Sequence, residues 1–148
     1  MNKPVQKRVD KTDAQKWEEL ITELQELAVL AEPGEYRVAM CMPKIGALNL
    51  VQPFNWRQWT EPFPEAVQCK LMDLETAIKH ITRICRAERF MEGVFMGSVK
   101  SGLLLGLCLV VREHTRGERA PSVMIKASLP LAEFLRFKHQ PNQSSKEN

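Results

Sequence analysis

The stretch DLETAIKHITRICRAERF, residues 73–90, carries the clearest secondary-structure pattern in the chain. Its apolar side chains recur at steps of three and four residues, which is the spacing of one face of an α-helix. Asp73 belongs to the residue types that cap helix N-termini. We therefore predict a helix over residues 73–90 that turns one face to the core. That face comprises Leu74, Ala77, Ile78, Ile81, Ile84 and Cys85.

The other side of this predicted helix is basic. At about 100° per residue, Lys79, Arg83 and Arg86 align opposite the apolar face. Cations aligned in this way are typical of a surface that contacts nucleic-acid phosphates. His80 lies on the flank of the helix, where we expect it to be solvated. Glu88 falls within the apolar arc, so its carboxylate needs a buried partner unless the helix has ended before it.

Prolines and aromatic residues gather upstream, in residues 53–64, PFNWRQWTEPFP. Proline excludes a regular helix or a central strand. Each aromatic side chain buries about 150–250 Å², so we expect this segment to pack as a plug on the domain; an exposed recognition loop is the alternative. Guanidinium groups stack on indole rings, which favours an ion network that fastens the predicted helix to the plug. The predicted network comprises Trp56, Trp59, Arg83, Arg86, Glu88, Arg89 and Glu92.

Two further helices are indicated, one on each side of this central region. Residues 12–31 carry an apolar stripe and begin with a capping-box pattern at Thr12. Residues 102–114 follow Ser101, a capping residue type, and are apolar nearly all round. Such a helix is central in its domain or is covered by a partner subunit. A buried strand is the alternative for residues 107–111.

The remaining patterns predict a small sheet. Residues 35–42 alternate between apolar side chains and others, and this period of two indicates a strand. Residues 48–51 and 123–126 are candidates for two more short strands, and residues 129–137 for a last helix. The predicted fold class is therefore α+β: a mainly helical single domain with one small antiparallel sheet.

Length and composition indicate one domain with loose ends. The chain has 148 residues, of which 44% are hydrophobic and 26% charged, as in an average globular protein. We expect a flexible arm over residues 1–11, a single globular domain over residues 12–139 and a disordered tail over residues 140–148.

Several classes of protein are disfavoured by the composition. The net charge of +3 is too small to indicate nucleic-acid binding by itself. The longest uncharged apolar stretch, residues 101–111, is about half of the roughly 20 residues that span a membrane, so we expect no membrane partner. The cysteines lack metal-ligand spacing and the first residues lack an apolar signal segment. We expect free thiols, a cytoplasmic location, and neither a metal nor a cofactor. The cysteines are Cys41, Cys69, Cys85 and Cys108.

Four short motifs follow one another within residues 50–112. They are Phe54-x-Trp56-x-x-Trp59, Ile81-Thr82-x-x-x-Arg86, Arg86-x-x-Arg89-Phe90-x-Glu92-Gly93 and Ser98-x-x-x-Gly102. In this combination the sequence resembles a family of uncharacterised bacterial proteins that is defined only as a domain of unknown function. The resemblance implies a bacterial, plasmid or phage origin and a cytoplasmic location, and it implies no activity. Asn55 and Glu88 stand where that family tends to have aspartate.

The sequence offers no motif for catalysis. Phosphate-binding loops, dinucleotide-binding glycines and zinc-protease motifs do not occur in it. We therefore expect an accessory protein that acts by protein–protein interaction or self-association, without catalysis. A nucleic-acid-binding module that uses Lys79, Arg83 and Arg86 is the alternative. A second alternative is an enzyme with Glu92 and Arg86 in its active site, where the carboxylate is the general base.

Overall fold

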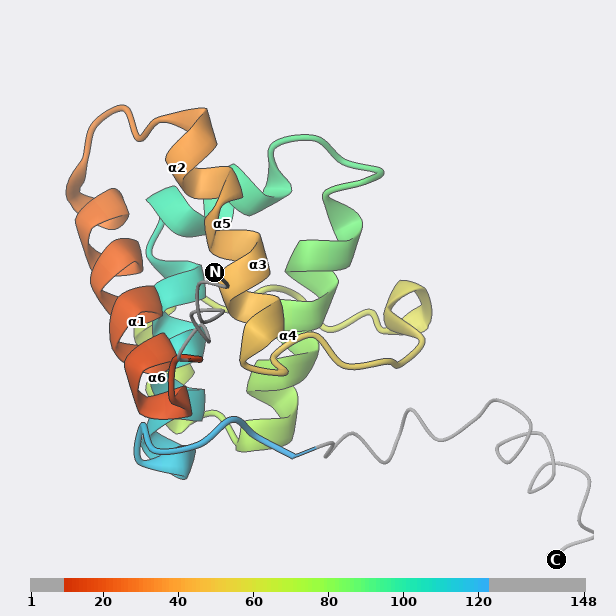
Figure 1. Ribbon diagram of the computed structural model, residues 1–148. Helices are drawn as coiled ribbons and strands as arrows, with labels where there is room; N and C mark the ends of the chain where they lie inside the picture. The colour runs from red at the N-terminus through yellow and green to blue at the C-terminus, as the bar shows by residue number, and fades with distance from the viewer. Residues whose placement is uncertain (1–9, 123–148) are drawn as a thin grey trace, which may run out of the picture.

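Helices account for all the regular secondary structure in residues 10–122, the part of the chain that the computed structural model describes (Figure 1). The order differs from the prediction at two places: two helices replace the strand predicted over residues 35–42, and an additional helix lies between those predicted over residues 73–90 and 102–114. The helices are α1 (Asp13–Val29), α2 (Glu35–Ala39), α3 (Cys41–Ala47), the 3-10 helices η1 (Trp56–Gln58) and η2 (Ala66–Leu71), α4 (Leu74–Ala87), α5 (Val94–Lys100) and α6 (Leu103–Thr115).

The predicted antiparallel sheet, and with it the α+β class, is wrong for the described residues. Residues 35–42 lie in α2 and the start of α3, and residues 48–51 form a turn and irregular chain. The buried positions here are Val38, Cys41 and Ile45, which are spaced by three and four residues as on a helix. The alternation seen in the sequence is misleading, because Tyr36 is 76% exposed. The predicted strand 123–126 and helix 129–137 lie outside the described residues.

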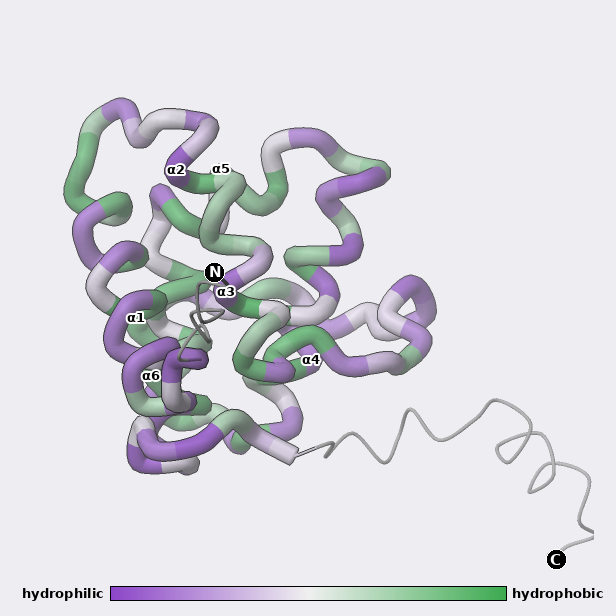
Figure 2. The backbone as a smooth tube through the Cα atoms, viewed as in Figure 1, coloured by the Kyte–Doolittle hydropathy of each residue, from purple (hydrophilic) through white to green (hydrophobic). Residues whose placement is uncertain are grey.

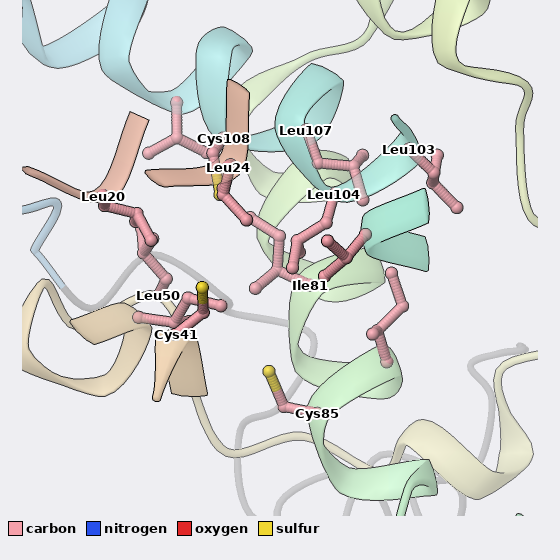
Figure 3. Packing of buried hydrophobic residues seen from close by; sticks show 14 of the residues in the cluster. Leu20, Leu24, Cys41, Leu50, Ile81, Cys85, Leu103, Leu104, Leu107 and Cys108 are labelled. Atoms are coloured by element: carbon pink, nitrogen blue, oxygen red, sulfur yellow. The ribbon is translucent and has the colours of Figure 1, made fainter. Parts of the chain in front are cut away.

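Helix α6 is the centre of the domain, as its nearly all-apolar sequence predicted. It packs against α1, α4, α5 and η2, and Figure 1 shows α4 running beside it. Leu104 and Leu107 are fully buried there, next to Ile81 of α4 (Figure 3). On its other side η2 approaches closely, because a Cβ atom at Gly106 would lie 3.2 Å from the Ala66 carbonyl oxygen.

Helix α4 confirms the strongest sequence pattern. The Asp73 carboxylate accepts a hydrogen bond of 2.7 Å from the backbone N–H of Thr76, so Asp73 is the predicted N-cap. The isoleucine side is buried as expected, and the helix ends at Ala87, earlier than the predicted Phe90. The next helix, α5, was not predicted. It starts after Gly93, whose φ of 97° is a left-handed conformation that glycine adopts without strain.

Helix α1 begins with the predicted capping box at Thr12. The last described residues are fastened to this helix start. The indole N–H of Trp17 donates to the Arg119 carbonyl oxygen at 2.8 Å, and the Ala120 N–H donates to the Asp13 carboxylate at 2.8 Å. Of the predicted flexible arm, residues 1–9 lie outside the described part of the chain, as does the predicted tail.

Length and hydropathy leave no described helix that could span a membrane alone. Helices α5 and α6 meet both criteria only when taken together, and the chain bends by 74° between them. Figure 2 shows that hydrophilic residues recur along α1 and α4 between hydrophobic ones, as expected for helices with one face on the core.

Candidate functional site

The aromatic segment, residues 53–64, packs against α4 as the plug that the sequence predicted. The ring of Trp59 lies 4.5 Å from the ring of His80, measured between centroids, and that of Phe63 lies 5.9 Å from it. Phe54 meets Trp59 edge to face at 5.7 Å. These contacts cover the flank of α4 that carries His80.

Arg83 is enclosed by this aromatic segment. Its guanidinium carbon lies 4.0 Å from the ring centre of Phe63 and 4.6 Å from that of Trp59. Nη1 donates to the Trp59 carbonyl oxygen at 3.1 Å. Burial lowers the pKa of Arg83, with Glu61 acting in the opposite direction. Arg83 therefore fastens the aromatic segment to α4 and is not free to bind a phosphate.

His80 is buried, contrary to the expectation of a solvated side chain. Only 2% of its surface is exposed. Burial, and secondarily the charge of Arg83, lowers the pKa of His80 to about 4. The neutral ring can accept a hydrogen bond at Nδ1, which lies 3.2 Å from Nη2 of Arg83. His80 and Arg83 thus form one polar contact beneath the aromatic rings.

The predicted basic face of α4 is largely covered. Lys79 pairs with Glu75 at 3.3 Å, and its side chain is only 15% exposed. Its ammonium group lies 5.8 Å from the ring centre of Phe54 and equally far from that of Trp59. Since Arg83 is covered too, Arg86 is the one member of the predicted face that is exposed.

Glu88 has a structural role that explains its place on the helical wheel. It follows the last residue of α4, and its carboxylate accepts hydrogen bonds from the backbone N–H groups of Gly93 at 3.2 Å and Phe95 at 2.8 Å. These groups lie at the start of α5, where free N–H groups favour a negative charge. Glu88 therefore holds the connection between the two helices in shape.

The predicted ion network does not form within the described part of the chain. Its charged members Arg83, Arg86, Glu88, Arg89 and Glu92 take part in none of the ion pairs found there. Of the predicted set, the structure does bring Arg83 and Trp59 into contact. Trp56 lies elsewhere, 6.1 Å from the ring of Phe90.

A cleft of about 350 Å³ opens between η1 and the end of α4, and we call it the arginine cleft. The guanidinium of Arg57 lies 4.4 Å from the ring centre of Phe90 and 5.4 Å from that of Trp56. Arg86 and Arg89 are exposed on the same cleft. No carboxylate is among the described residues that line it. The lining comprises Gln52, Pro53, Phe54, Trp56, Arg57, Arg86, Arg89 and Phe90.

A second cleft of about 350 Å³ lies between α2 and the start of α5, and we call it the glutamate cleft. Glu35 and Glu92 are exposed at it, and its other side chains are mostly apolar. Sequence reasoning missed this cleft because residues 35–42 were predicted as a strand. The lining comprises Glu35, Val38, Ala39, Met42, Glu88, Glu92, Gly93, Phe95 and Met96.

Residues 88–93, the α4–α5 turn, form the border between the two clefts. Phe90 is 63% exposed and Met91 is 53% exposed at this turn. Figure 2 shows the same feature as hydrophobic chain at the tip of the turn with hydrophilic chain on each side. Arg86 lines one cleft and Glu92 the other, so the two residues of the proposed enzyme site do not share a cleft.

The cysteines are placed as unreactive core residues. All four are free and buried. Burial raises the pKa of Cys41 to about 11 and that of Cys85 to about 12, so both are protonated thiols at neutral pH. Among residues 10–122 no cluster of three histidine, cysteine, aspartate or glutamate side chains could hold a metal ion.

Comparison with known proteins identifies a family whose function is unknown. A family model described as "Family of unknown function (DUF6508)" matches residues 35–116, which is more than half of the chain. The match includes the aromatic segment, α4, the α4–α5 turn and both clefts. No curated protein matches the chain, and no solved structure does. The chain belongs to this family of unknown function, in agreement with the expected resemblance to an uncharacterised domain family.

Proposed function

We propose that the protein is a non-catalytic accessory protein that binds another protein through the α4–α5 turn and the clefts beside it. The observation that carries the proposal is the exposure of Phe90 and Met91 next to exposed Arg86 and Arg89. Aromatic residues, methionine and arginine are the types enriched where proteins meet. Anchor residues of such interfaces are typically aromatic or arginine.

The charge of the arginine cleft indicates the chemistry of the partner. Arg86 and Arg89 form no ion pair within residues 10–122. A guanidinium group binds a carboxylate with two parallel hydrogen bonds. A partner that presents carboxylates beside an apolar side chain would meet both features of this surface.

The turn is held in one shape before any partner binds. The backbone N–H groups of Phe90 and Met91 both donate to the Ala87 carbonyl oxygen, at 2.9 and 2.8 Å. The Glu88 carboxylate binds the far end of the turn at Gly93 and Phe95. A surface that is already ordered loses less conformational entropy on binding, which favours a role in recognition.

Site-specific photo-crosslinking in cells tests this proposal. A photo-reactive phenylalanine analogue replaces Met91, whose side chain is 53% exposed. We expect a protein adduct that is lost with Arg86→Glu, because the reversed charge repels a carboxylate-bearing partner. Lys70→Glu on η2 is the matched control, since Lys70 is also exposed and far along the chain from the turn. No protein adduct, or one that persists unchanged in Arg86→Glu, refutes the proposal.

Binding of nucleic acid is the second candidate function, with Arg57, Arg86 and Arg89 in place of the covered Lys79 and Arg83. The lack of a carboxylate in the lining of the arginine cleft and the presence of Trp56 favour it. Each phosphate contact contributes about one unit to the slope of log affinity against log salt. Fluorescence anisotropy with labelled single-stranded DNA and RNA should then give a slope of about −2 to −3. Absence of binding at low salt excludes this candidate.

We also propose a cytoplasmic location. The four cysteines remain free thiols in the structure, and free thiols persist in a reducing compartment.

A further inference from the structure

The tip of the α4–α5 turn carries opposite charges at its two ends and apolar residues between them, so it is complementary to a second copy that runs in the opposite direction. It reads RFME from Arg89 to Glu92, and all four residues are exposed. The outer two have opposite charges, and neither has an ion-pair partner within residues 10–122. The inner two, Phe90 and Met91, are large apolar side chains that face solvent.

Two-fold symmetry makes use of such a pattern. In a symmetric dimer, residue i of one subunit contacts residue j of the other and the reverse contact also occurs. When two copies of the turn meet antiparallel, with the axis between Phe90 and Met91, Arg89 faces Glu92 of the partner subunit. Phe90 then faces Met91 of the partner subunit. Each pair forms twice, and no like charges face each other.

We infer that this protein associates with a second copy of itself through residues 89–92, as a two-fold symmetric dimer. The inference rests on the proposed function, because it names the protein partner that the turn binds. The turn of the other subunit then occupies the two clefts.

The clefts on the two sides of the turn extend the same complementarity. The arginine cleft borders the Arg89 side, with Arg57 and Arg86, and the glutamate cleft borders the Glu92 side, with Glu35. The two-fold rotation that pairs Arg89 with Glu92 of the partner subunit also turns the basic side of each copy towards the acidic side of the other. A nucleic acid that extended from the arginine cleft across the turn would instead meet the carboxylates of the glutamate cleft.

The contact area is limited to one turn and two small clefts. Such an interface belongs to the small end of specific protein contacts. We therefore expect an equilibrium between monomer and dimer that depends on concentration, and one that weakens as salt screens the two ion pairs.

Charge exchange at Arg89 and Glu92 tests the inference on the full chain. Sedimentation velocity measures the association constant of wild type, Arg89→Glu, Glu92→Arg and the variant with both changes. Each single reversal places two pairs of like charges face to face, so we expect the constant to fall at least about tenfold. The double variant restores opposite charges in swapped positions and should regain most of the association. Lys70→Glu serves as the control, and circular dichroism checks that each variant is folded.

The results separate this inference from the proposed function. A wild-type monomer at every concentration up to its solubility limit, or a dimer that both single reversals leave unchanged, overturns the inference. If the chain is a monomer and the photo-crosslinker at Met91 still captures another protein in an Arg86-dependent manner, the proposed function stands without the dimer. If neither experiment detects a protein at the turn, both are wrong.

Discussion

Replacement of Arg83 by alanine removes the side chain that fastens the aromatic segment to α4. The arginine contacts the rings of Trp59 and Phe63 and donates to the Trp59 carbonyl oxygen. The same variant leaves His80 without its contact to Nη2. We expect the aromatic segment to loosen and the whole domain to lose stability.

The magnitude of this loss follows from the contacts. Two cation–π contacts contribute about 0.5–1 kcal/mol each at partly exposed positions. A hydrogen bond from a charged donor contributes about 1.5–3 kcal/mol. Against these stands the buried Nε of Arg83, which has no hydrogen-bond partner within residues 10–122 and costs about 1–3 kcal/mol. The net destabilisation for Arg83→Ala is therefore about 2 kcal/mol, or about 6 °C in Tm for a domain of this size.

Chemical denaturation followed by tryptophan fluorescence measures this difference. Trp17 is 1% exposed and so reports on global unfolding. Arg86→Ala is the matched control, because Arg86 is on the same helix but is exposed, and its loss should change stability by less than about 0.5 kcal/mol. Equal stability of the two variants would refute the view that Arg83 fastens the segment.

Four other substitutions test the structure at separate points. His80 has a pKa of about 4 in the folded protein and an ordinary value of 6.5, so the unfolded chain binds the proton more readily. The stability that depends on neutral His80 should be fully present above pH 6.5, and the free energy of unfolding should fall by up to about 3 kcal/mol between pH 6.5 and 4. Urea titrations of wild type and His80→Phe check this. An equal loss of stability in acid for both proteins would contradict it. Glu88→Ala should lower the free energy of unfolding by about 1 kcal/mol, because the N–H groups at the start of α5 lose their acceptor. An unchanged Tm would count against this role of Glu88. Gly106→Ala should destabilise by about 1–3 kcal/mol because its Cβ would press on η2. Gly97→Ala in α5 should be neutral or stabilising, because a Cβ there would have no packing neighbour within 4 Å among residues 10–122. Calorimetry that ranks the two in the opposite order would contradict the packing of η2 on α6.

The long helices could be predicted because each repeats its pattern over several turns. The apolar steps of α4 and the capping box of α1 are local features, and the structure confirms both. Residues 35–42 were mispredicted as a strand because two short helices give too few turns to separate a period of two from one of 3.6. Burial of Val38 and exposure of Tyr36 decide the matter, and burial is set by the tertiary structure.

The candidate site was predictable only in part. Stacking of arginine on indole was expected, and Arg83 with Trp59 confirms it. The conflict at Glu88 was visible on the helical wheel, and it is resolved because α4 ends at Ala87. Arg57 was missed, because its position beside Phe90 depends on how η1 meets the end of α4 and leaves no mark in the local sequence. The glutamate cleft was missed for the same kind of reason.

Covalent trapping of the dimer at Met91 tests the central claim, that two copies of this protein associate through the α4–α5 turn. The native cysteines are buried, so a short thiol crosslinker will react chiefly with an introduced cysteine. Met91→Cys lies at the proposed two-fold axis, and Leu71→Cys on η2 is the control because Leu71 is 95% exposed and far from that axis in the proposed dimer. We predict rapid formation of a covalent dimer from Met91→Cys and slow, collision-limited formation from Leu71→Cys. Equal rates for the two variants, or no covalent dimer from Met91→Cys, would contradict the account.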